Sequence, residues 1–135
     1  MKVEIVEAEE RTIAIIIRKS FNELGTTSFT NPELPLQVVI QIRASGHKIP
    51  AHIHLPTKSF PQEGRTRHEI LHLDTGSAEV RLFTKNGNFV KSIDLEEGDT
   101  ILIMEGHEII YKSDVRVLEI KEGQYAGLEK EKTLL

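Results

Sequence analysis

The chain has 135 residues, a formal net charge of −4 at pH 7 and no cysteine. This length allows one buried core but not two, so we expect a single domain over residues 1–135. Without cysteine, disulfides and thiolate ligands are excluded, and any metal must be held by nitrogen and oxygen atoms. The scattered basic residues give no positive patch for nucleic acid, and no stretch approaches the roughly 18 to 20 apolar residues that span a membrane. We therefore predict a soluble, cytoplasmic protein whose partners are neither nucleic acid nor membrane.

Short runs of alternating apolar and polar residues recur along the chain, and long helical stripes are absent. This pattern predicts an all-β fold, because side chains of a strand point alternately to its two faces. In chain order, the predicted strands are residues 2–7, 12–19, 36–44, 48–54, 69–74, 77–83, 89–94, 100–104, 108–111 and 115–120.

Turn residues separate these strands. Residues 74–77 (Asp-Thr-Gly-Ser) and 85–88 (Lys-Asn-Gly-Asn) predict two hairpins in series, since Gly and Asn accept the positive φ of tight turns. Residues 20–35 and 55–67 contain prolines and lack alternation, so both are predicted loops. In the tail from residue 123 to 135, one helical turn is expected at 126–130, packed on the outside of the strands.

Two histidines occur at alternate positions of one predicted strand. His52 and His54 flank Ile53, so their side chains leave the same face about 7 Å apart. Two imidazoles at this spacing can chelate one ion. A His-x-His pair by itself is more often two hydrogen-bonded wall residues than a metal site.

Glu69 and His107 are the candidates that would complete such a site. Alternation puts Glu69 on the same face as Leu71 and Leu73, where a carboxylate without a cation or strong donors is costly to bury. A metal held by the histidines would supply that cation, whereas the alternative is a strand-end Glu in solvent. His107 follows the strand 100–104 and a turn; alone, it would more often be a turn residue hydrogen-bonded to a neighbour.

The spacing of these residues resembles the first motif of the cupin superfamily, which runs Gly, five residues, His-x-His, a variable gap, Glu, six residues, Gly. Every element of this motif is present, in the order Gly46, His52, His54, Glu69 and Gly76.

The family's second motif runs Gly, five residues, Pro-x-Gly, two residues, His. Here Gly98 and Gly106 match, Met104 replaces the proline, and His107 follows Gly106 directly.

The resemblance covers about residues 36–125. It implies a cupin-type double-stranded β-helix (jelly-roll barrel) with one divalent metal, Fe, Mn, Ni or Zn, held by His52, His54, Glu69 and His107. In related small cupins, N-terminal strands often pair across a dimer, so the resemblance also implies a homodimer.

Five further residues are candidates for binding a small-molecule substrate or ligand. Gln41 and Arg43 share one strand face, and Tyr111 shares one with His107. The loop 56–67 carries Arg65 and Arg67 and is a candidate lid that recognises an anionic group. For each of these side chains, exposure to solvent is the alternative.

Three functions are consistent with this pattern. The first is a metal-dependent enzyme, an oxygenase or an isomerase, that acts on a small polar molecule such as one related to sugars. The second is a non-catalytic module that binds a small molecule, with a metal that tethers the ligand or stabilises the barrel. The third is a metal-free barrel with histidine as general base, against which the predicted position of Glu69 beside the histidines argues.

Overall fold

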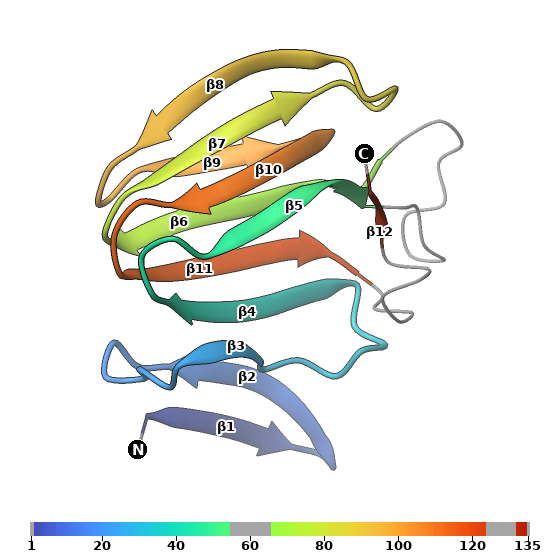
Figure 1. Cartoon of the computed structure of the whole chain (residues 1–135). Coiled ribbons are helices and arrows are strands. Elements are labelled where there is room, and N and C mark those ends of the chain that lie inside the picture. Colours follow the sequence, from blue (N-terminus) through green and yellow to red (C-terminus); the bar gives the residue numbers. More distant parts are fainter. Residues whose placement is uncertain (1, 55–65, 124–131, 135) are drawn as a thin grey trace.

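A computed structural model describes residues 2–54, 66–123 and 132–134, and all the regular structure in these ranges is β-strand (Figure 1). One sheet has the order β12-β5-β10-β7-β8, and the other has the order β3-β4-β11-β6-β9. The remaining strands, β1 and β2, pair with each other. The predicted all-β fold is confirmed. The strands are β1 (Val3–Ala8), β2 (Arg11–Ile17), β3 (Gly25–Ser28), β4 (Leu36–Arg43), β5 (Lys48–His54), β6 (Glu69–Thr75), β7 (Ala78–Phe83), β8 (Phe89–Leu95), β9 (Thr100–Ile103), β10 (Gly106–Tyr111), β11 (Val115–Glu122) and β12 (Lys132–Leu134).

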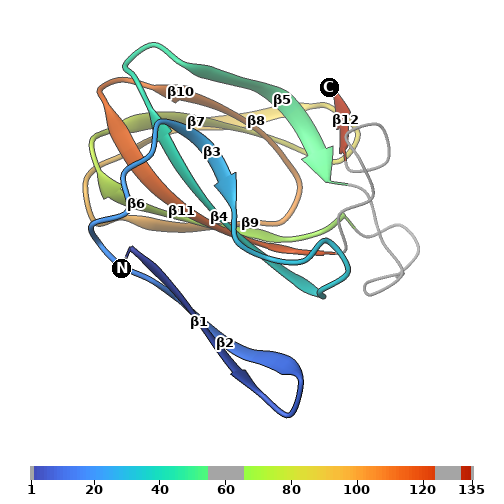
Figure 2. The ribbon, with the colours of Figure 1, turned by 90° about the horizontal axis from the view of Figure 1, so that it is seen from below.

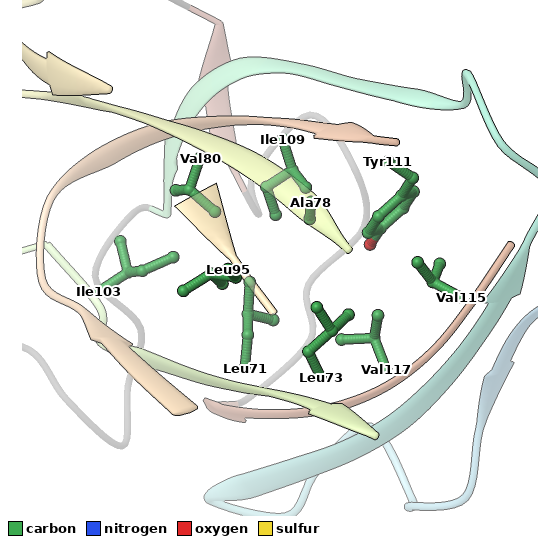
Figure 3. Close-up of a cluster of buried hydrophobic side chains, with 10 residues drawn as sticks. All are labelled: Leu71, Leu73, Ala78, Val80, Leu95, Ile103, Ile109, Tyr111, Val115 and Val117. Carbon is green, nitrogen blue, oxygen red and sulfur yellow. The ribbon is translucent and has the colours of Figure 1, made fainter. Parts of the chain in front are cut away.

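The two five-stranded sheets face each other around a common interior (Figure 2). Alternation decides which side chains enter it: in β6, Glu69, Leu71 and Leu73 are buried while Ile70 faces out, as predicted. A cluster of apolar side chains from both sheets fills one part of the interior (Figure 3). Its members are Leu71, Leu73, Ala78, Val80, Leu95, Ile103, Ile109, Tyr111, Val115 and Val117.

The sheet topology corrects one of the two predicted hairpins and confirms the other. The turn at residues 74–77 does not close a hairpin, because β6 pairs with β9 and β11 while β7 pairs with β8 and β10. It carries the chain from one sheet to the other, and Gly76 stands there with φ of 89°. The second predicted hairpin, at residues 85–88, is confirmed by the antiparallel pairing of β7 with β8.

Three segments differ from the predicted elements. The predicted loop 20–35 contains β3, which pairs with the edge of β4. Hydrogen bonding to the backbone of β4 stabilises this strand, and the sequence of the segment does not have the alternation that would have predicted it. Strand β10 begins earlier than predicted, so His107 lies within a strand and not in a turn. In the tail, β12 pairs with β5 at the edge of a sheet. Of the expected lid over residues 56–67, residues 56–65 lie outside the described residues, as does the helical turn expected at 126–130.

The β1–β2 hairpin extends away from the two larger sheets (Figure 2). At its tip, Glu9 and Glu10 adopt positive φ of 52° and 63°, as a two-residue turn of this kind requires. Ile5 and Ile13 remain 57% and 58% exposed. Within the described ranges, no helix is long and apolar enough to cross a lipid bilayer.

Candidate metal centre

Three of the four predicted ligands converge between the two sheets. His52 on β5 and His107 on β10 are directly paired across neighbouring strands, so their rings leave adjacent positions of one sheet. Glu69 is the first residue of β6 in the opposite sheet. All three residues are at most 3% exposed, so the cluster lies inside the fold and not on its surface.

The donor atoms of this triad are close together. His107 Nε2 lies 3.1 Å from Glu69 Oε2, and the His52 and His107 ring centroids are 4.3 Å apart. One donor atom from each of the three residues lies within 4.8 Å of the other two. An ion with bonds of about 2.0–2.2 Å holds its ligand atoms about 3–4 Å apart, so small side-chain movements would bring all three into its coordination shell.

Backbone carbonyls orient the two imidazoles for this role. His52 Nδ1 lies 2.7 Å from the carbonyl oxygen of Pro50, and His107 Nδ1 lies 3.4 Å from that of Glu105. A carbonyl only accepts, so these two contacts favour the tautomer in which Nδ1 carries the proton and donates it. In that tautomer Nε2 carries a lone pair, as a metal-binding histidine needs. The residues therefore fit a divalent metal by position, and the backbone contacts favour the tautomer that such a site uses.

The fourth predicted ligand, His54, ends β5, and its side chain lies outside what the structure describes. The triad is therefore the part of the predicted ligand set that the structure places together.

A cavity of about 690 Å³ adjoins the triad and is lined by residues of both sheets. His52 and His107 contribute to its wall, which is otherwise mainly formed by β3, β4, β5 and β11. The volume is within the range typical of small-molecule sites. Its other lining residues are Thr26, Ser28, Thr30, Pro32, Gln37, Val39, Gln41, Arg43, His47, Lys48, Ile49, Pro50, Ile109, Glu119 and Lys121.

Glu119 is a buried acid at this site that the sequence analysis did not select. It lies on β11, lines the cavity, and is hydrogen-bonded to Glu69, while Gln41 Nε2 donates to Glu119 Oε2 at 3.4 Å. Burial raises the pKa of the Glu119 carboxyl well above its usual value, and the neighbouring Glu69 carboxylate raises it further. A signal was present: alternation puts Glu119 on the same face as Val115 and Val117, where an acid is out of place.

Glu119→Gln is expected to raise the Tm of chelator-treated protein, because an amide keeps hydrogen bonds to both neighbours and needs no proton. The raised pKa means that the folded wild type binds more protons than the unfolded chain above about pH 4.5, so wild-type stability falls as pH rises. The Tm difference should therefore grow from pH 5 to pH 8, reaching about 4 °C for each 1 kcal/mol. Differential scanning fluorimetry checks this, with the exposed Glu7→Gln as control. A variant less stable than the wild type at pH 8 would contradict the expectation.

The structure distributes the predicted substrate-binding residues unequally. Gln41 and Arg43 line the cavity, on the face of β4 that was expected. Tyr111 belongs to the apolar core cluster, and its hydroxyl is buried without a hydrogen bond in the described structure. Arg67 is 2% exposed and donates from Nη1 to the Glu122 carbonyl oxygen at 2.9 Å; neither it nor Tyr111 is among the described lining residues. Arg65 lies outside the described residues.

Solved structures similar to this chain include several oxalate-converting enzymes. An oxalate decarboxylase of Bacillus subtilis aligns with a TM-score of 0.62 and 20% identity over 87% of this chain and 30% of its own. Oxalate oxidase in complex with the substrate analogue glycolate aligns with a TM-score of 0.60 and 17% identity, over 82% of this chain and 54% of its own. The chain thus spans about three tenths of the decarboxylase chain.

A smaller protein matches over most of both lengths. A cupin superfamily protein of Desulfitobacterium hafniense aligns with a TM-score of 0.56 and 15% identity, over 78% of this chain and 83% of its own. No protein-family model matches the sequence, and no curated protein matches it. At these identities the similarity establishes a shared fold, and function has to be derived from the site itself.

Proposed function

The chain has the cupin fold, and from this premise we propose that it is a metal-dependent enzyme acting on a small polar molecule. The observation that carries the proposal is the buried triad of His52, Glu69 and His107 on the inner side of two sheets. A buried carboxylate beside two imidazoles is the kind of nitrogen and oxygen donor set that holds a divalent metal in proteins. The adjoining cavity gives a substrate access to the same place.

We propose a single divalent ion, Fe, Mn, Ni or Zn, with His54 as the fourth ligand beside the triad. Imidazole nitrogen and carboxylate oxygen suit each of these metals, so the donor set by itself does not choose among them. The bound ion would supply Lewis-acid chemistry for an isomerase or redox chemistry for an oxygenase. The chain's own contribution is to fix the imidazole tautomers through Pro50 and Glu105 and to present Gln41 and Glu119 to the substrate.

The proposed substrate is a small polar molecule such as a hydroxy acid or a sugar derivative. The cavity wall combines hydroxyl groups of Thr26, Ser28 and Thr30 with the charged side chains of Arg43 and Glu119. Such a mixture recognises oxygen-rich molecules rather than hydrocarbons. The names of the similar oxalate decarboxylase and oxalate oxidase point to substrates of the same polar kind.

Elemental analysis of protein purified from its native host tests the proposal. We expect close to one divalent metal ion per chain, and iron together with oxygen uptake in the presence of small hydroxy acids would select the oxygenase class. Zinc or manganese without oxygen uptake would select the isomerase class. The protein could also bind one metal ion per chain and be stabilised against heat by ligands without converting them. That result would support the non-catalytic binding module instead. A preparation without metal that cannot be reloaded would reject the metal centre.

We also propose that the chain is one cytoplasmic domain that forms a homodimer through the β1–β2 hairpin. Within the described residues the hairpin strands pair only with each other, and Ile5 and Ile13 stay more than half exposed. Exposed apolar side chains on a projecting strand pair favour association with another copy. Ile13→Lys is expected to convert the dimer to monomer in light scattering, whereas Val90→Lys, at an equally exposed position on β8, should not. A wild type that is monomeric at 100 μM or so would contradict this proposal.

A further inference from the structure

Arg43 is a charged side chain on the cavity wall that has no acidic partner among the residues described. It ends β4 on the face that also carries Gln41, and both residues line the cavity. Within the described parts of the chain, Arg43 forms no ion pair; its Nη2 donates to the hydroxyl of Thr26 on β3. A guanidinium has five N–H donors, so most of its capacity is not used by the contacts that the structure shows.

One of these donors is buried without a hydrogen bond. Arg43 Nε is sealed from solvent and has no acceptor among the described residues. Burying a charged donor without an acceptor is costly, so such groups are usually satisfied by a ligand or by water. The neighbouring Thr26 hydroxyl accepts from Nη2 and holds the guanidinium at the cavity wall, where a ligand would meet its remaining N–H donors.

The charges near Arg43 favour an anion at this end of the cavity. His47, in the connection between β4 and β5, also lines the cavity, and its pKa is lowered by burial and by the positive charge of Arg43. The acid on the described cavity wall, Glu119, is four positions along β11 from the residue that pairs with Arg43. Lys48 is partly neutralised by Glu108 at 3.7 Å. Arg43 is therefore the principal positive charge at this end of the cavity.

The strand register separates Arg43 from the metal triad. Arg43 pairs with Val115 of β11, whereas Glu69 pairs with Lys121, six residues further along the same strand. At about 3.3 Å per residue the two backbone positions are roughly 20 Å apart, and long side chains shorten the gap between their functional groups. A ligand that contacts both groups therefore has to extend along the strands.

We propose that Arg43 binds an anionic group, a carboxylate or a phosphate, at the end of the ligand distant from the metal centre. This inference rests on the proposed function, because it assigns the substrate class of the same cavity: a molecule several carbon atoms long, with an anionic group at one end and an oxygen donor for the metal at the other. Arginine suits this role because its planar fork donates two parallel hydrogen bonds to a carboxylate or a phosphate.

The test measures binding of named anions to the full-length, metal-loaded protein by isothermal titration calorimetry. Succinate, glutarate and adipate probe carboxylates at increasing length, glycerol 3-phosphate probes phosphate, and 1,5-pentanediol is the uncharged control. We expect at least one anion to bind and Arg43→Gln to weaken it about tenfold or more. The matched control is Arg81→Gln, because Arg81 pairs with Glu108 and does not line the cavity. The tighter-binding group of anions identifies the ligand as carboxylate or phosphate.

Two outcomes would overturn the inference: no anion of the set binds the wild type, or Arg43→Gln binds the best anion as tightly as the wild type does. If Arg43→Gln does not fold, a crystal structure of the wild type with the best anion decides, since the anion must lie within hydrogen-bond distance of the guanidinium. The titrations are repeated on chelator-treated protein to separate this inference from the metal proposal. Arg43-dependent binding to a protein that never takes up metal would support the anion site and reject the metal centre.

Discussion

Replacement of His107 by alanine is expected to weaken metal binding at least about a hundredfold. Losing a residue that merely orients a ligand already costs about ten- to a hundredfold in affinity, and His107 would be a ligand itself. Its Nε2 lies 3.1 Å from Glu69 Oε2, so alanine removes one of the three donor atoms that the structure brings together. Metal content after dialysis against a weak chelator, measured by mass spectrometry, checks the expectation.

The matched control for this variant is His72→Ala. His72 lies on β6, as Glu69 does, but on the opposite face, where its Nδ1 contacts the hydroxyl of Thr100 at 2.9 Å. It should keep the metal content of the wild type. Equal metal content in His107→Ala and His72→Ala would show that His107 is not a ligand, and the proposed centre would then be wrong.

Gly76→Ala is expected to destabilise the protein by about 3 kcal/mol or more. Gly76 has φ of 89°, a conformation that costs a side-chain-bearing residue about 1–2 kcal/mol. A Cβ there would also collide with the carbonyl oxygen of Asp114 and lie 2.7 Å from Ser113 Oγ and 2.8 Å from Val115 Cγ1. Because the first of these is backbone, the turn between β6 and β7 has to move, which adds a further penalty of about 1–3 kcal/mol.

Chemical denaturation of Gly76→Ala and Gly98→Ala separates the two contributions. Gly98 has almost the same φ, 90°, but a Cβ added to it meets no atom within 4 Å. The Gly98 variant should therefore lose only about 1–2 kcal/mol, the part that belongs to the backbone conformation. Equal losses in the two variants would show that the close approach of residues 113–115 to Gly76 is not rigid.

The sequence by itself determined the all-β class and nearly every strand. Alternation predicts these features because the face to which a side chain points depends only on its position in the strand. Leu71 and Leu73 are buried and Ile70 is exposed, as their positions require. The Asn-Gly pair at residues 86–87 predicted the β7–β8 hairpin for the same reason, since the turn's φ values depend on those residues. The triad residues were also identified, from motif spacing and from the cost of burying Glu69.

Only the tertiary structure decided which strands are neighbours and what faces the cavity. The turn at residues 74–77 has the residues of a hairpin, yet it crosses between sheets, because strand pairing is settled by the packing of the whole sheet. In the same way, Glu119 reaches Glu69 because β11 pairs with β6, and Arg43 faces a cavity lined by residues from β3 to β11. A local pattern assigns a residue to a face but does not specify what lies opposite, and the chemistry of a site depends on side chains that meet across sheets.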